Sequence, residues 1–366
     1  MVLKNIYSGS EKMSMENKRQ RRCEISFLNM LFCLIVIFIH IISYAVAELS
    51  PNTLGYNMVL FPWRFSSFVV QGFVMLSGVK LFLSEKDTMP YKKWLVLRFK
   101  SIVVPYIFCF IVYYAFYYIV FDYPLEFGFI SKQFLLGDLV CHLYFIPIIV
   151  QFDLLFPIWK KLIIKCSPII VIPLCVIFSL LFENHFPAML GVLNPDISFA
   201  YNDRLFTTYL SFYIAGCYIG KNYDSFLNIL KTNSKTILGC FIITVPLYTY
   251  YTYIAYNGLA SVPFINYLHF LYVWCVIMLI YSISAKFAPY LMNKIKLLKK
   301  IDAVSYDIYL WHMLVLFSTD YLLKKLGIVS AVYSFFIRTA IVYTVTIALC
   351  AIIKHLKKKL KQEALS

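Results

Sequence analysis

The chain has 366 residues, of which 61% are hydrophobic and only 14% are charged, and its formal net charge is +16. Soluble domains contain about 25% charged residues, so this composition excludes an ordinary soluble protein. Apolar runs of about twenty residues recur along the whole chain and indicate helices that cross a membrane.

The apolar runs predict an all-α, polytopic membrane helical bundle with about ten transmembrane helices. A helix needs about 20 residues to cross a hydrocarbon core of about 30 Å, and most of the runs reach that length. We divide the chain into a polar tail over residues 1–24, one membrane domain over 25–354 and a basic tail over 355–366. The predicted spans are 25–47, 60–83, 101–121, 138–159, 167–182, 202–220, 236–256, 264–284, 303–322 and 329–354.

The positions of the basic residues predict the orientation of this bundle. Most lysines and arginines fall in the two tails and in alternate connections, and the other connections hold few, mainly Lys132, Lys324 and Lys325. The positive-inside rule then places both termini in the cytoplasm. The same positions argue against a nucleic-acid partner, although they permit contact with anionic lipids or a nucleotide phosphate. The ten cysteines form no CxxC pair and no zinc-like spacing, so we expect no metal site.

An ionisable ring interrupts the first predicted span. His40 stands in the run LIVIFIHIISY over residues 34–44, about 15 residues or about 22 Å from the cytoplasmic end of its helix. A polar group past the middle of a membrane is expensive and suggests a functional site. A neutral histidine that is hydrogen-bonded to a neighbouring helix is the structural alternative.

Charged residues also stand near the outer ends of three predicted spans. Arg64 either extends to the membrane surface or meets an anionic group inside the bundle. Asp138 and His142 are four residues apart and share a helix face, so they form a local pair or part of a polar pocket. A metal there would need a third ligand that the sequence does not supply. Asp203 and Arg204 are expected to face solvent.

The last two predicted spans hold further polar residues. His312 falls near the middle of the ninth span, five residues after Asp307. Arg338 stands well inside the tenth span, where its permanent charge needs a carboxylate, carbonyl groups or water. Together with the polar residues above, these positions predict a cavity inside the bundle that is suited to acid–base chemistry or to the passage of a solute.

Five segments, taken in order, resemble the bacterial membrane acyltransferase-3 family, the integral-membrane O-acyltransferases that modify surface glycans. The segments are EISFLNMLFCLIVIFIHIISY, VVQGFVMLSGVKLF, LRFKSIVVPY, HLYFIPIIVQFDLLFPIW and SYDIYLWHMLVL. They are similar to the family's opening helix with its histidine, its phenylalanine-rich Ser-Gly helix, its basic stretch before Pro-Tyr, its His-x-Trp-Phe helix and its Ile-Tyr-Leu-x-His segment. The resemblance covers roughly residues 24–354, with Tyr144 where tryptophan is usual.

The resemblance implies that His40 is the catalytic residue. A basic residue usually stands eleven positions earlier in the family, where this chain has Asn29, so that charge is absent or supplied from elsewhere. An acyl-CoA co-substrate, with acetyl-CoA expected, would be held through its nucleotide by Lys92, Lys93, Arg98 and Lys100. The substrate pocket is expected to include Arg64, His142, Tyr144, His312 and Arg338.

The implied function is transfer of an acyl group, with acetyl expected, from cytoplasmic acyl-CoA to a hydroxyl of a cell-surface polysaccharide or lipid-linked glycan. The expected location is the bacterial cytoplasmic (inner) membrane, and the expected partners are the glycan or glycolipid acceptor, membrane lipids and polysaccharide-assembly proteins. Transport or flipping of a polysaccharide or lipid-linked precursor is the alternative. A transporter needs a wide path and no indispensable base, whereas an acyltransferase should not tolerate the loss of His40.

Overall fold

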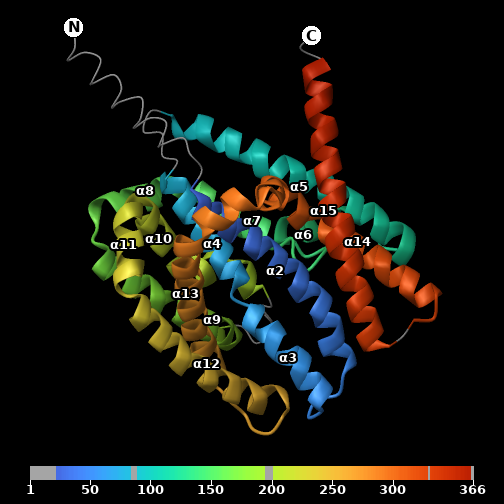
Figure 1. Ribbon diagram of the computed structural model, residues 1–366, viewed down its shortest axis with the longest axis horizontal. Helices are drawn as coiled ribbons and strands as arrows, with labels where there is room; N and C mark the ends of the chain where they lie inside the picture. The colour runs from blue at the N-terminus through green and yellow to red at the C-terminus, as the bar shows by residue number, and fades with distance from the viewer. Residues whose placement is uncertain (1–21, 84–88, 194–200, 329, 364–366) are drawn as a thin grey trace.

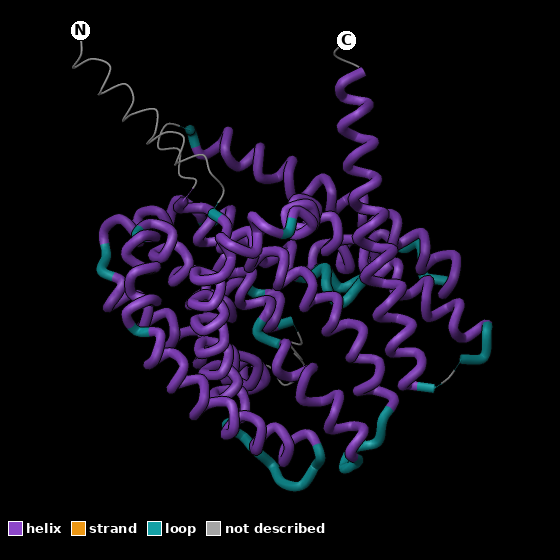
Figure 2. Tube along the Cα trace, viewed as in Figure 1, coloured by secondary structure: helices purple, strands orange, loops and turns teal. Residues whose placement is uncertain are grey.

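The structure is a computed structural model that describes residues 22–83, 89–193, 201–328 and 330–363. These residues form α-helices, one short 3-10 helix and no strand (Figures 1 and 2). The predicted all-α fold is therefore confirmed for the described part of the chain. The elements are α2 Cys23–Glu48, α3 Leu54–Ser66, α4 Val69–Leu83, α5 Tyr91–Phe121, α6 Phe127–Leu136, α7 Phe145–Leu154, α8 Phe156–Lys165, α9 Pro168–Leu193, η1 Asn202–Arg204, α10 Phe206–Lys221, α11 Tyr223–Thr232, α12 Ser234–Tyr256, α13 Ile265–Lys294, α14 Lys296–Lys325 and α15 Ala331–Glu363.

Seven helices of the described chain are long and apolar enough to cross a membrane. They are α2, the α3–α4 unit, α5, α9, α12, α13 and α15. A multi-pass membrane protein is thus supported, while the number of about ten spans and the cytoplasmic termini stay predictions. The start of α2 and the end of α15 lie on one side of the bundle (Figure 1). We call this the basic side, and the side where α2 ends at Glu48 the far side.

The predicted helix over 138–159 is wrong as a continuous element. Residues 138–144 form a turn, and the shorter helices α7 and α8 follow it. Gly137 opens this turn with a φ of +63°, and a Cβ atom on it would lie 2.7 Å from the carbonyl oxygen of Leu143. Only glycine tolerates both constraints. The turn brings His142, which is 2% exposed, into the interior of the bundle.

The position of α10 explains why the predicted span at 202–220 is only weakly hydrophobic. Twelve of the sixteen residues of this helix are buried, so it lies inside the bundle. Gly216 and Gly220 face α4, where a Cβ atom on Gly220 would lie 2.5 Å from the carbonyl oxygen of Val79. Small residues at such positions let two membrane helices pack closely. The hydroxyl groups of α10 therefore meet protein rather than lipid.

Helix α2 is the central element of the fold. It packs against α3, α4, α13, α14 and α15, and α4 runs beside it in the opposite direction. Asn29 lies near its basic-side end, and His40 follows eleven residues later, about 16 Å along the helix axis. The helix therefore links two separate polar regions of the bundle.

Candidate active site

Three histidines from distant parts of the chain form a cluster inside the bundle. His40 comes from α2, His142 from the turn before α7 and His312 from α14. The ring centroids of His142 and His312 are 4.7 Å apart, and that of His40 lies 5.3 Å from His312 and 6.1 Å from His142. The fold thus joins three residues that the sequence places between the middle and the outer ends of their predicted spans.

Backbone carbonyl groups hold two of these rings in place. Nε2 of His142 lies 3.3 Å from the carbonyl oxygen of Leu310, and Nδ1 of His312 lies 2.8 Å from that of Tyr309. A carbonyl oxygen only accepts, so these two ring nitrogens carry the hydrogen in the neutral form. Their second nitrogens, Nδ1 of His142 and Nε2 of His312, are buried and make no hydrogen bond among the described residues. Each is therefore an unoccupied acceptor inside the protein.

His40 is the histidine with the least hydrogen-bond restraint. Its Nδ1 lies 3.4 Å from Sγ of Cys141, which is a weak hydrogen-bonding group. The ring borders a small cavity of about 110 Å³. Other residues that line this cavity are Val36, Ile39, Val69, Val70, Phe73, Cys141, His142, Tyr144, Phe145 and Tyr309. The arrangement gives one histidine both room to move and access to a space that could hold a reacting group.

A larger cavity of about 350 Å³ lies on the basic side, within the size range of small-molecule sites. Its walls are mostly polar or aromatic, with side chains from α2, α4, α5, α7 and α14. Polar residues of the wall are Asn29, Ser77, Lys80, Arg98, Ser101, Asp302 and Ser305. The cavity therefore offers both cations and hydroxyl groups to a ligand.

Asn29 lies at the centre of a polar network in the larger cavity. Its Nδ2 donates to Oδ1 of Asp302 at 3.1 Å and to Oγ of Ser305 at 2.5 Å. Nζ of Lys80 donates to Oδ1 of Asn29 at 2.5 Å. The position where the resemblance led us to expect a basic residue thus has a cation beside it, supplied by α4. Sequence reasoning missed Lys80 because it is 51 residues away in the chain.

Of the four residues predicted to hold the nucleotide, only Arg98 lines the larger cavity. Its Nε lies 3.0 Å from Oδ2 of Asp153, whose side chain is 5% exposed. Lys92, Lys93 and Lys100 are exposed on α5. These three lysines can meet a ligand at the protein surface but do not line the described cavity.

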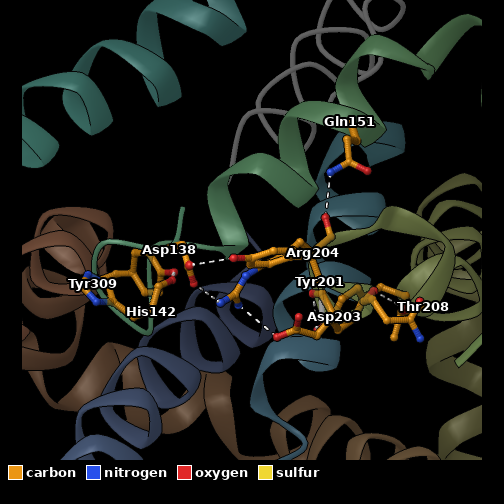
Figure 3. A network of polar contacts seen from close by, with 10 residues as sticks. Asp138, His142, Gln151, Tyr201, Asp203, Arg204, Thr208 and Tyr309 are labelled. Atoms are coloured by element: carbon orange, nitrogen blue, oxygen red, sulfur yellow. Dashed lines mark hydrogen bonds and ion pairs between the residues drawn. The ribbon is translucent and has the colours of Figure 1, made fainter. Parts of the chain in front are cut away.

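A second polar network, made of ion pairs, centres on Arg204 (Figure 3). The guanidinium of Arg204 lies 2.9 Å from Asp138 and 3.0 Å from Asp203, and its centre is 4.5 Å from the Tyr144 ring. Only 14% of the Arg204 side chain is exposed, so the expectation that it faces solvent is wrong. Asp138 pairs with this arginine rather than with His142. Because Tyr144 also lines the small cavity, the network fixes one of the cavity walls.

Arg338 finds its partners on the far side. Its Nε donates to Oδ1 of Asp320 at 2.6 Å, and Glu48 lies 3.7 Å away. The guanidinium also lies 4.6 Å from the ring of Tyr44, one helical turn beyond His40 on α2. The sequence allowed a carboxylate, carbonyl groups or water as the partner of Arg338, and the structure has two carboxylates there.

Arg64 lies apart from the histidine cluster. Its guanidinium is 5.0 Å from the ring of Tyr256 and 5.8 Å from that of Tyr248. These cation–π contacts, typical of arginine beside aromatic rings, tie α3 to α12.

No described residue set combines three His, Cys, Asp or Glu side chains in an arrangement that could hold a metal ion.

The chain was compared with known protein families, curated proteins and solved structures. A family model for an acyltransferase domain matches residues 24–355. This range runs from the first turn of α2 into α15 and contains the three histidines and both cavities. Neither the curated proteins nor the solved structures that were searched contain a match.

Proposed function

The chain belongs to the acyltransferase-3 family and is a membrane acyltransferase, and we propose that its donor is a cytoplasmic acyl-CoA and its acceptor a glycan. In this proposal an acyl group, with acetyl expected, passes to a hydroxyl of a cell-surface polysaccharide or lipid-linked glycan. The basic side then faces the cytoplasm of a bacterial inner membrane. Polysaccharide-assembly proteins and membrane lipids are the partners that this location provides.

The observation that supports this proposal is the order of the two cavities along α2. The larger one, with Lys80 and Arg98 in its walls, lies on the basic side, and the smaller one surrounds His40. A cationic entrance suits the phosphates of CoA. A flexible pantetheine arm can then carry the thioester inward to the histidines. The site thus separates binding of the nucleotide from the chemistry.

The reaction balances without any further reagent. The hydroxyl oxygen of the acceptor attacks the thioester carbonyl, the C–O bond forms and the C–S bond breaks. The hydroxyl proton passes through a base to the sulfur, and CoA leaves as its thiol. His40 is the best base, because it borders the cavity and its ring is not tied to a backbone carbonyl. It serves either directly or as a covalent relay.

His142 and His312 complete this reading of the cluster. Their unoccupied ring nitrogens are acceptors that can share a proton with His40 while their own rings stay fixed by the backbone. His142 and His312 are two fixed bases beside the mobile base His40. Together they keep the proton close to the reacting atoms, as general acid–base catalysis requires. Transport of a lipid-linked precursor is less well supported, because it needs a wide path through the bundle and the described cavity beside His40 has a volume of only about 110 Å³.

Transfer by the purified protein tests the proposal. The full chain, in lipid nanodiscs, receives radiolabelled acetyl-CoA and envelope glycan from the native host, and label in the glycan is counted. We expect His40→Ala to lower transfer by about 10²- to 10⁴-fold while the protein still inserts. The exposed His185 on α9 provides the matched control, since His185→Ala should transfer normally. Normal transfer by His40→Ala would rule out the proposed mechanism.

A further inference from the structure

Three aromatic rings form a partition between the two cavities. Phe73 of α4, Phe145 of α7 and Tyr309 of α14 line both the larger cavity and the smaller one. The centroid of the Phe145 ring lies 5.8 Å from each of the other two, and those two lie 6.4 Å apart. These are contact distances for aromatic rings. A group that moves from the larger cavity to His40 must therefore pass between these rings.

The three rings differ in how firmly they are held. The hydroxyl of Tyr309 donates to the backbone carbonyl of His142, which anchors this ring. Phe73 and Phe145 have no polar atom for such an anchor, and both are only half-buried. The two phenylalanines are thus the parts of the partition that can rotate, while Tyr309 is its fixed member.

The space beyond the partition is small and partly aliphatic. Val36 and Ile39 of α2 and Val69 and Val70 of α4 form its apolar walls. An engineered apolar cavity of about 150 Å³ binds benzene, which has six carbon atoms, so a cavity of about 110 Å³ holds about four or five non-hydrogen atoms. A thioester carbonyl and one or two further carbons fill that space. The polar walls near His40 then surround the carbonyl, and the valines surround the carbon chain.

We propose that Val70 and Phe73 determine the length of the acyl group and limit it to roughly two or three carbons. This inference rests on the proposed acyl-CoA donor. Val70 closes the small cavity against a longer chain, and Phe73 keeps that cavity separate from the larger one. A longer acyl chain leaves the thioester carbonyl on the basic side of the partition, out of reach of His40. Both residues act only through the space that their side chains occupy.

Transfer from a series of donors tests this assignment. Inverted membrane vesicles from the native host, with its own copy of the protein replaced by each variant, receive radiolabelled acetyl-, propanoyl-, butanoyl- or octanoyl-CoA, and label in the envelope glycan is counted. For the wild type we expect transfer to fall about tenfold or more for each methylene beyond the limit. Val70→Ala should extend the range by one or two carbons. Phe73→Ala should also admit octanoyl-CoA.

Two residues on the same helix provide matched controls. Val74 and Phe82 are buried on α4 but line neither cavity, so Val74→Ala and Phe82→Ala should keep the wild-type donor series. Val70→Ala removes little volume, so it tests the proposal even if Phe73→Ala does not insert.

Each other outcome overturns the inference in a distinct way. Equal transfer of acetyl and octanoyl groups by the wild type rejects the length limit but leaves the proposed function intact. An unchanged series in Val70→Ala, or an equal change in Val74→Ala, rejects the assigned residues. No transfer from any acyl-CoA by the wild type rejects the donor, and with it both the proposed function and this inference.

Discussion

The two cavities along α2 differ in the hydrogen bonding of the polar groups in and beside them. On the basic side, Asn29 has partners for both its amide oxygen and its amide nitrogen. In the histidine cluster beside the small cavity, one ring nitrogen each of His142 and His312 is buried without a partner among the described residues. A buried polar group without a partner costs about 1–3 kcal/mol, so fold stability alone does not account for the histidines. The contrast suggests that Asn29 helps to hold the helices together and that the two histidine nitrogens serve the reaction.

The largest effect on acyl transfer should follow a change in the histidine cluster. We expect His312→Ala to lower acyl transfer by about 10²-fold or more because a proton acceptor beside His40 is lost. The half-buried His269 provides the comparison, because its Nε2 lies 2.7 Å from Oγ of Ser67 and already has a partner. His269→Ala should lower Tm and leave transfer near the wild-type level. Transfer at the wild-type rate by His312→Ala would end the distinction between the two regions.

The next prediction is a loss of stability when the ion pair of Arg98 and Asp153, beside the larger cavity, is broken. Arg98→Ala leaves the carboxylate of Asp153 buried without its partner, and breaking such a pair costs about 3–5 kcal/mol. The double variant Arg98→Ala with Asp153→Asn should recover much of that loss, because no buried charge remains. Thermal unfolding of the detergent-solubilised protein measures both. A single variant no less stable than the double would show that the pair is not a structural element.

The network of Asn29 and Lys80 should give a smaller, coupled effect. Lys80→Met removes the donor to Oδ1 of Asn29 and should cost about 1–3 kcal/mol of unfolding free energy. Asn29→Arg alone should also destabilise the protein, since it places two cations together. The exchange variant Asn29→Arg with Lys80→Asn moves the charge to the position where the family usually has it. We expect it to recover unfolding free energy that the single variants lose, with a coupling energy of about 0.5–3 kcal/mol, and strictly additive losses would show that the two residues act independently.

The sequence predicts local properties of the chain, but it does not predict contacts between distant segments. Apolar runs predict the helical bundle, and the depth of His40 in its run indicates a functional residue, because both properties are local. The contacts of Asn29 with Lys80 and of Arg338 with Asp320 join different helices, and hydropathy holds no information on such pairs. The turn over residues 138–144 is also missed, because an interior turn is as apolar as a helix. Gly137 was the one local signal for it.

The smallest effect should come from the exposed lysines of α5. Lys92 and Lys93 lie outside the larger cavity, so they attract the phosphates of a donor only through solvent. Exposed ion pairs contribute about 0.2–1 kcal/mol, and Lys92→Ala or Lys93→Ala should therefore raise the KM for acetyl-CoA by about fivefold at most. At 1 M salt the Debye length falls to about 3 Å, and the difference from the wild type should then vanish. A larger increase in KM that persists at high salt would mean that these lysines bind the donor directly, and the entrance to the site would then lie along the start of α5 rather than in the cavity beside Asn29.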